Sequence, residues 1–213
     1  TTCAAIAKYQ GFDLIGLTVN YGQNHAFELE AAKKVANHYG IDEHSIIDID
    51  LAQFGGSALT SNKIKIPRGR KISEMNDIPA TYVPARNTIF LSIALAKAET
   101  VNSFDIFIGV NAIDYSGYPD CRPVFISEFE KLANLATKEA VQNKGSYKIH
   151  TPLITLSKAE IIKKGISLKV DYSLTSSCYK PNEYGNPCGF CDACILRKKG
   201  FENAGFKDPL DYQ

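Results

Sequence analysis

Hydrophobic and polar residues along positions 1–165 alternate between strand-like and helix-like patterns. Short, mostly apolar runs bounded by turn residues predict strands, and longer stretches with apolar residues three and four apart predict amphipathic helices. The expected strands are residues 14–19, 45–49, 104–109 and 147–150. The expected helices are residues 1–9, 25–39, 87–98, 125–143 and 157–165. Strands that alternate with such helices predict an α/β fold, with a parallel sheet covered by helices on both faces.

Two segments interrupt this pattern. Residues 51–85 lack periodicity and include several Gly and Pro residues, so we expect a lid, a binding loop or a disordered segment that is mobile without ligand. Residues 110–123 form a loop rich in Gly, Pro and Asp directly after the third expected strand. Ligands of open α/β sheets bind beyond the carboxyl ends of strands. Both segments, together with residues 20–23 after the first expected strand, are therefore candidate ligand-binding loops.

The cysteines are unevenly distributed. Cys3 and Cys121 stand alone, whereas the other four fall within 17 residues as Cys178-x9-Cys188-x2-Cys191-x2-Cys194. Two cysteines that flank two residues of a turn can direct both sulfurs at one ion, and four thiolates complete the tetrahedron that Zn²⁺ prefers. Such a site has no open position and is structural. The alternatives are a redox Cys-x-x-Cys motif and unpaired buried thiols.

Charge and composition narrow the class of protein. The 213 residues carry 24 basic and 23 acidic side chains, so no overall field attracts nucleic acid or an anionic membrane. No apolar run approaches the length of a membrane-spanning helix, and the first residues do not have the pattern of a secretory signal. Clustered cysteines without signs of an oxidising compartment predict a cytoplasmic protein.

The loop after the third expected strand is dense in polar and aromatic groups suited to a planar heterocycle. The carboxylate of Asp114 or Asp120 can accept hydrogen bonds from the donor edge of a guanine-like base, and Tyr115 or Tyr118 can stack on its face. Arg122 can form a fork with a carboxylate. An ordinary Pro-Asp turn with solvated charges explains these residues equally well.

Two helix starts carry basic residues that suit an anion. Arg86 and Asn87 stand where a helix begins, and a helix amino terminus offers unpaired amides to a phosphate. Lys158 lies in the first turn of a later helix, where its charge opposes the helix dipole unless an anion is bound. A plain helix start with a surface Arg, and a solvated Lys, remain the alternatives.

Taken together, these stretches resemble the 7-cyano-7-deazaguanine synthase family, QueC, of the PP-loop ATP-pyrophosphatase group. The matching stretches run through essentially the whole chain in order: residues 20–23, 83–87, 116–122, 151–153, 157–160 and the four clustered cysteines. The Ser-Gly-Tyr-Pro-Asp-Cys-Arg stretch combined with the cysteine motif is quite specific.

The resemblance implies a ligase reaction. Members of the family convert 7-carboxy-7-deazaguanine, with ammonia and ATP, into the 7-cyano product that is used to make queuosine. The carboxylate is activated as an adenylate and pyrophosphate leaves, ammonia then gives an amide, and a second activation allows dehydration to the nitrile. Magnesium is expected with ATP, the zinc is structural, and the family commonly forms homodimers.

The resemblance also assigns candidate site residues. Those expected to be catalytic are Arg86 and Lys158. Those expected to bind the deazaguanine are Tyr21, Gln23, Asp114, Tyr118, Asp120 and Arg122. Those expected to bind ATP are Thr1, Thr2, Cys3, Arg86 and Asn87. The expected zinc ligands are Cys178, Cys188, Cys191 and Cys194.

The expected division is an ATP-binding α/β domain over residues 1–170 and a zinc-binding segment over residues 171–213. The family's phosphate loop, Ser-Gly-Gly-x-Asp-Ser, and the strand before it are expected directly upstream of Thr1. Two other functions stay open: another PP-loop adenylating enzyme, such as a tRNA thiolase or an amidating synthetase, and a zinc-knuckle protein that binds a partner without catalysis. Balanced charge disfavours a tRNA-acting enzyme.

Overall fold

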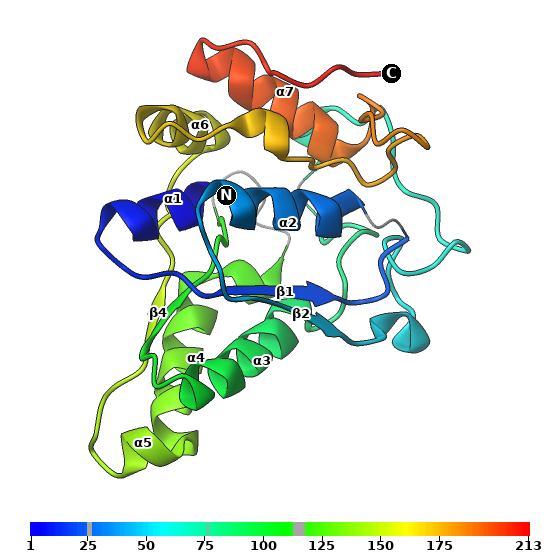
Figure 1. The fold of residues 1–213 in the computed structure, drawn as a ribbon. Helices are drawn as coiled ribbons and strands as arrows, with labels where there is room; N and C mark the ends of the chain where they lie inside the picture. The colour runs from blue at the N-terminus through cyan, green and yellow to red at the C-terminus, as the bar shows by residue number, and fades with distance from the viewer. Residues whose placement is uncertain (25–26, 76, 113–117) are drawn as a thin grey trace.

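The computed structural model describes residues 1–213 apart from 25–26, 76 and 113–117 (Figure 1). The strands are β1 (Gly16–Asn20), β2 (His44–Asp48), β3 (Asp105–Phe107) and β4 (Lys148–His150). The α-helices are α1 (Thr2–Tyr9), α2 (Phe27–His38), α3 (Arg86–Thr100), α4 (Pro123–Ala136), α5 (Lys138–Val141), α6 (Lys158–Ser167) and α7 (Asp192–Ala204). Short 3-10 helices are η1 (Leu51–Phe54), η2 (Ile72–Glu74), η3 (Pro119–Cys121) and η4 (Tyr172–Leu174). Within these described residues, no helix is both long and apolar enough to span a bilayer.

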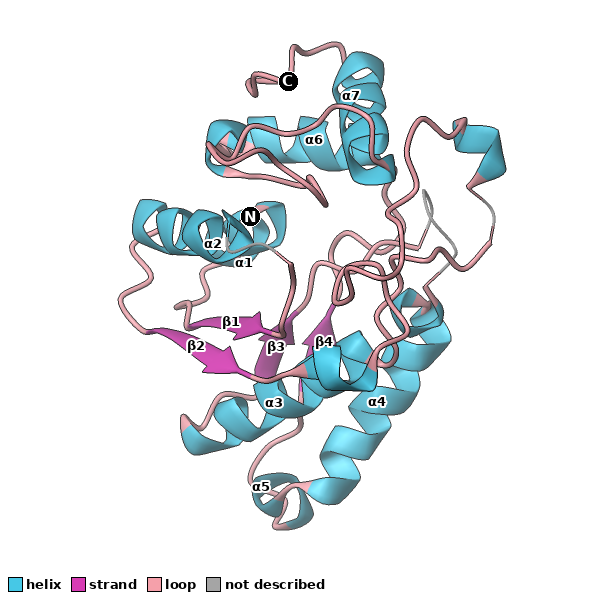
Figure 2. Ribbon diagram, turned by 90° about the vertical axis from the view of Figure 1, so that its right-hand side faces the viewer, coloured by secondary structure: helices cyan, strands magenta, loops and turns pink. Residues whose placement is uncertain are grey.

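The strands form a layer between helices, which confirms the expected α/β fold with parallel strands (Figure 2). Helices α1 and α2 cover one face, α3 and α4 cover the other, and α6 and α7 stack outside α1 and α2. Pairing is parallel in both cases, from Gly16–His44 to Asn20–Asp48 and from Asp105–Lys148 to Phe107–His150. The described strands therefore make two separate pairs. A cavity of about 750 Å³ is lined by residues of β1, α3 and β3.

The largest apolar core lies between α3, α4 and the β3–β4 pair. It contains Leu91, Ile106, Ile126, Phe129, Tyr147 and Ile149, each at most 7% exposed. A smaller cluster of Val19, Tyr21, Leu51, Leu59 and Val83 packs around the end of β1. The alternation of apolar residues in the sequence is thus explained by burial on one side of α3 and α4 against strands that are covered on both faces.

Three elements differ from the sequence-based expectations. The helix expected over residues 125–143 is two helices, because Thr137 has an extended backbone and its hydroxyl donates to the Ala133 carbonyl. The cysteine segment ends in helix α7, which hydrophobic periodicity had not indicated. Residues 51–85, expected to lack structure, contain η1 and η2 and pair with the cysteine segment through a bridge between Arg68 and Cys191.

Helices α6 and α7 lie close together because a glycine stands at their contact. A Cβ atom on Gly200 would come within 2.9 Å of the Lys158 Cβ and 3.1 Å of Ile162 Cδ1. The contact places the first turn of α6, and with it Lys158, directly beside the helix that follows the cysteines. The position of a candidate catalytic residue thus depends on the packing of the C-terminal segment.

Candidate active site and metal centre

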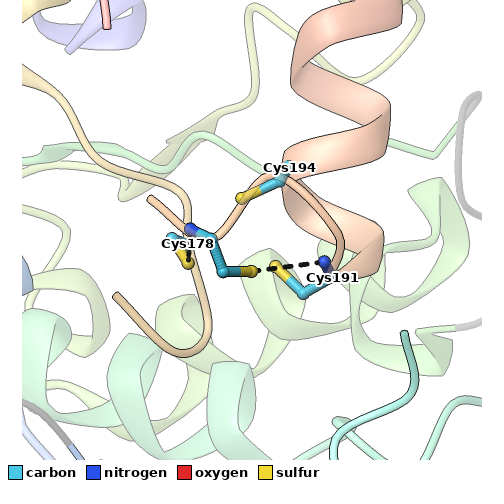
Figure 3. A group of neighbouring side chains, drawn as sticks. Cys178, Cys191 and Cys194 are labelled. Atoms are coloured by element: carbon cyan, nitrogen blue, oxygen red, sulfur yellow. Dashed lines mark hydrogen bonds between the residues drawn. The ribbon is translucent and has the colours of Figure 1, made fainter. Parts of the chain in front are cut away.

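The four clustered cysteines converge on one point. Their sulfur atoms all lie within 4.8 Å of one another, and each side chain is at most 5% exposed. The sulfurs of Cys178, Cys191 and Cys194 point toward each other (Figure 3). A tetrahedral Zn²⁺ with bonds of about 2.3 Å needs sulfurs about 3.8 Å apart. The cluster therefore needs only a small contraction to hold Zn²⁺, which confirms that the site is compatible with structural zinc.

Backbone amides donate hydrogen bonds to two of these sulfurs. Cys178 Sγ accepts hydrogen bonds from the N–H groups of Lys180 (3.3 Å) and Cys188 (3.2 Å). Cys188 Sγ accepts from Phe190 (3.5 Å) and Cys191 (3.4 Å). The contact with Cys191 and burial raise the pKa of the Cys178 thiol, and the two backbone N–H groups directed at its sulfur partly offset that rise.

The last two ligands are presented by the start of α7. Cys191 is the N-cap of the helix and Cys194 lies in its first turn, so their side chains are three positions apart on one face. Gly189 adopts a φ of +77°, a backbone conformation that lets the chain turn into the helix. Hydrogen bonds with Cys178 and Cys194 lower the pKa of the Cys191 thiol. A Zn²⁺ ion bound between the four sulfurs takes the place of the protons that these thiols share.

A buried ion pair fastens the chain end to α7. Arg197 donates from Nε and Nη2 to the two carboxylate oxygens of Asp208, at 2.8 and 2.9 Å. Its Nη1 donates to the Thr175 hydroxyl at 2.7 Å, and Tyr212 donates to Asp208 at 2.6 Å. Less than a tenth of either ion-pair side chain is exposed. These contacts enclose the cysteine cluster between α7 and the final residues.

A second group of polar side chains gathers where β1 and α3 meet. Arg86, the first residue of α3, lies with its guanidinium carbon 5.8 Å from the ring centre of Tyr21 and 5.9 Å from that of Phe90. Burial lowers the pKa of Arg86, but the nearby groups of Tyr21, Tyr118 and Asp120 outweigh this effect. The pKa of Arg86 is therefore raised overall. Arg86 is therefore a permanent cation in an aromatic environment.

The start of α3 is clasped by the loop that precedes α4. The Asn87 backbone N–H donates to Asp120 Oδ2 at 2.9 Å, and the Asn87 side-chain amide donates to the Asp120 carbonyl at 3.1 Å and to Cys121 Sγ at 3.2 Å. Asn87 and Asp120 are 6% and 7% exposed. Two candidates that the sequence assigned to different ligands, ATP and the deazaguanine, are thus bonded to each other beside Arg86.

Three hydroxyl groups connect this loop to the cysteine segment. Tyr118 Oη lies 3.3 Å from the Thr81 hydroxyl, and Tyr118 also hydrogen-bonds Tyr179. Burial raises the pKa of Tyr179 well above its usual range, so its phenol is neutral. Tyr179 follows the first zinc ligand, Cys178, in the sequence. The candidate substrate loop is therefore in contact with the cysteine cluster through the partly buried phenol of Tyr179.

Three of the candidate ATP-binding residues line a cavity of about 450 Å³, whereas Arg86 lines the cavity beside β1 and β3. Thr1, Thr2 and Cys3 contribute the start of α1, and Lys158 contributes the start of α6. Tyr118 borders the same cavity, so both candidate ligand sets meet there. Burial raises the pKa of the Cys3 thiol to about 11, which keeps it protonated and unreactive. The cavity thus offers the amino termini of α1 and α6 together with the ammonium group of Lys158.

The remaining candidates are less closely associated. Gln23 folds back so that its side-chain oxygen accepts from the Tyr21 amide at 2.9 Å. Arg122 is an exposed residue at the N-cap of α4. Asp114 lies outside the described residues. The roles that the sequence assigned to these three residues stay predictions.

Sequence reasoning missed three residues in these surroundings. Tyr179 and Asp192 line the cavity, and Arg70 forms an ion pair with Asp192 across 122 residues of sequence. Tyr179 and Asp192 stand directly beside zinc ligands, so their adjacency to Cys178 and Cys191 was an available signal. Arg70 gave no signal, because only the fold brings residues 66–70 to the cysteines.

Comparison with known proteins adds the family. Residues 1–205 match the family model described as queuosine biosynthesis protein QueC. The chain is 58% identical to the 7-cyano-7-deazaguanine synthase of Syntrophotalea carbinolica, with 100% of this chain and 91% of the relative covered. It is 61% identical to that of Citrifermentans bemidjiense and 57% identical to that of Myxococcus xanthus, each over 100% of this chain and 92% of the relative. The chain, with its cysteine centre and parallel strands, therefore belongs to the QueC family of queuosine biosynthesis proteins.

Proposed function

We propose that the chain converts 7-carboxy-7-deazaguanine, ammonia and ATP into 7-cyano-7-deazaguanine. Identity of 57–61% to curated synthases over the full length of this chain is the observation that carries the proposal. The chain is an enzyme of queuosine biosynthesis, and its family uses ATP as a substrate. The cavity beside α1 and α6 and the aromatic pocket around Arg86 support the assignment of two substrate regions to one site.

In the proposed activation step, a carboxylate oxygen of the substrate attacks the α-phosphorus of ATP and pyrophosphate leaves. The amide groups at the start of α1, near Thr1, Thr2 and Cys3, and the ammonium of Lys158 then face the phosphates, with Mg²⁺ accompanying ATP. Arg86, with Asn87 beside it, balances the charge that develops during transfer, because it is a partly buried and permanent cation.

In the amidation step, ammonia attacks the acyl carbon of the adenylate and AMP leaves with the bonding electrons. In a second activation, the amide oxygen attacks the α-phosphorus of another ATP and pyrophosphate leaves. The oxygen then departs in AMP as the nitrogen loses its two protons, and the nitrile forms. We propose that the deazaguanine base of the substrate is bound by side chains from two places. These are the residues after β1 and the loop before α4: Tyr21, Gln23, Asp114, Tyr118, Asp120 and Arg122. Tyr21 and Tyr118 have the best-supported positions, because both contribute to the electrostatic environment of Arg86.

The proposed division of the chain follows from the cysteine cluster. Residues 1–170 form the ATP-binding domain, and residues 171–213 form the zinc-binding segment, whose four thiolates leave no open position for catalysis. Bonds from Arg197 to Asp208 and Thr175 lie within this segment, which supports treating it as one structural unit.

We further propose a cytoplasmic homodimer that binds neither nucleic acid nor membrane. Six unpaired thiols favour a reducing compartment. An apolar face on α4 and α5 supports self-association, because Val124, Leu132, Leu135 and Val141 are each more than half exposed. Light scattering after gel filtration measures the oligomeric state directly. A molar mass equal to that of one protomer at micromolar concentration would exclude the dimer.

The activity is tested with purified full-length protein, ATP, Mg²⁺, ammonium and 7-carboxy-7-deazaguanine. The nitrile product and released AMP and pyrophosphate are measured by mass spectrometry. Arg86→Ala is expected to lower kcat/KM roughly 100- to 1,000-fold, as for loss of one charge-stabilising donor. Lys131→Ala, which removes an exposed pair with Glu128, is the matched control and is expected to be fully active. ATP turnover that does not depend on the deazaguanine acid would reject the proposal.

A further inference from the structure

A stretch of residues 66–70, which we call the strap, runs along the cysteine centre. Ile66 packs against the cysteine cluster, and the Gly69 N–H donates to the Phe190 carbonyl at 2.8 Å. Arg68 and Cys191 form an antiparallel bridge. The strap is therefore attached to the metal centre by an apolar contact and by backbone pairing, although more than 100 residues separate the two segments in sequence.

The strap ends in a partly buried ion pair with the first residue of α7. Arg70 Nε donates to Asp192 Oδ1 at 3.2 Å, and Arg70 Nη2 donates to Asp192 Oδ2. The Asp192 side chain is 4% exposed and that of Arg70 is 24% exposed. A two-point fork fixes both distance and orientation, which a single ammonium contact does not. The carboxylate also suits a helix amino terminus.

Asp192 belongs to the wall of the 450 Å³ cavity that contains Thr1 and Lys158. The segment that contains the strap then continues to Thr81, which is 1% exposed and lies 3.3 Å from the Tyr118 hydroxyl. It ends at Arg86, where α3 begins. One continuous segment thus connects the fork at the cavity wall to both candidate substrate regions.

We propose that Arg70 is a positioning residue, and that its fork to Asp192 latches the strap against the cavity wall so that Tyr118 and Arg86 are held in place for substrate binding. This inference rests on the proposed function. Opening the latch lowers the fraction of molecules that are ready to bind, and apparent affinity falls in proportion to that fraction. Arg70 acts only through the strap and contacts neither the substrate nor the reacting atoms.

The test uses the double variant Arg70→Met/Asp192→Asn in the full-length, zinc-loaded protein. Removing both charges avoids leaving one buried ion without a partner, so this variant is expected to fold and to keep its zinc. The KM for 7-carboxy-7-deazaguanine is expected to rise about tenfold with kcat within about twofold. Arg70→Lys keeps the charge without the fork and is expected to lie between parent and double variant.

Limited trypsin digestion gives a readout that needs no activity. Lys63, Lys65, Arg68 and Lys71 are cleavage sites in or beside the strap. Cleavage there is expected to be about tenfold faster in the double variant, because proteolysis follows the population of the open form. The control Lys131→Met, which breaks an exposed pair on α4, is expected to match the parent in both assays.

The outcomes separate the two proposals. A parent protein that makes no nitrile rejects the proposed function, whereas the trypsin comparison still decides whether the latch exists. Unchanged KM and unchanged cleavage in the double variant would overturn the latch. Loss of zinc or a large fall in melting temperature in the double variant would also overturn it, because the pair would then be a structural support of the metal centre.

Discussion

The cysteine centre and the pocket around Arg86 are built in opposite ways. All four ligands of the metal centre come from 17 consecutive residues, and the turns between them position the sulfurs. The Arg86 pocket instead combines the end of β1, the start of α3 and the loop before α4. The first site is specified by local spacing, and the second requires that the α/β layers assemble.

This difference determines how each site fails. A single substitution removes a ligand from the metal centre. The cysteine segment is then destabilised, because so short a segment depends on the bound ion more than on apolar contacts for its stability. The Arg86 pocket contains several mutually bonded groups, so a single change there weakens positioning without unfolding the protein.

Loss of one cysteine ligand is expected to have the largest effect. Cys191→Ser should lose bound zinc and most soluble yield, because structural zinc contributes roughly 10–16 kcal/mol in zinc-finger peptides. Zinc per chain is measured by elemental analysis, with about one ion expected in the parent. Cys3→Ser, a cysteine outside the cluster, should keep the metal. Metal-free Cys191→Ser protein that melts like the parent would show that the cluster is not a structural zinc site.

The next effect is expected at the buried pair of Arg197 and Asp208. Asp208→Asn should lower the free energy of unfolding by about 3–5 kcal/mol, because it leaves a buried guanidinium without its counter-ion. Glu202→Gln, which breaks the exposed pair with Lys199, should cost less than about 1 kcal/mol. Urea unfolding measures both, and equal losses would mean that burial does not strengthen the Arg197 pair.

The same pair predicts an acid dependence. Burial raises the pKa of Asp208, but hydrogen bonds from Arg197 and Tyr212 outweigh it, and the net shift is downward. A lowered pKa stabilises the folded protein above the unfolded value of about 3.9, and this stabilisation is lost as the pH falls through the folded value. Melting of the parent should decline below about pH 4 more steeply than melting of Asp208→Asn. If the melting temperatures of the parent and of Asp208→Asn fall equally with pH, the lowered pKa of Asp208 does not contribute to stability.

The clasp between α3 and the loop before α4 should give a smaller effect. Asp120→Ala leaves the buried Asn87 N–H without an acceptor, and the expected loss of stability is about 1–3 kcal/mol. Asp120→Asn keeps an accepting oxygen and should melt close to the parent. If Asp120→Asn is stable but raises the KM for the deazaguanine acid, the carboxylate charge also serves the substrate. If both variants melt like the parent, the clasp contributes nothing to stability.

The smallest change in stability is expected at Arg122. This residue is exposed, so Arg122→Lys should alter the free energy of unfolding by less than about 0.5 kcal/mol. The KM for the deazaguanine acid should nevertheless rise, because lysine cannot form a fork with a carboxylate, whereas the KM for ATP should not change. Steady-state kinetics decide, and an unaltered KM in Arg122→Ala would leave Arg122 as an exposed residue at the start of α4.

Much of the fold was predictable because its signals are local. Each apolar run that predicted a strand overlaps a strand of the structure, and Ser157 with Glu160 forms the capping box expected at the start of α6. The break at Thr137 was not predictable, since apolar periodicity continues through it. The backbone there is set by the bond from the Thr137 hydroxyl to the Ala133 carbonyl and by the bond from the Lys138 N–H to the Glu99 carboxylate of α3. Helix α7 escaped notice because the cysteines dominate its first turn.

Local patterns along the chain specify the metal centre, the α/β arrangement and the family, because ligand spacing, hydrophobic period and motif order are properties of neighbouring residues. Tertiary structure alone decided that Asn87 bonds to Asp120, that Tyr118 meets Tyr179, and that Arg70 reaches Asp192. The physical reason is that a hydrogen bond or ion pair depends on the distance and angle between two groups. When the groups are tens of residues apart in the chain, only the packing of helices on strands sets that distance.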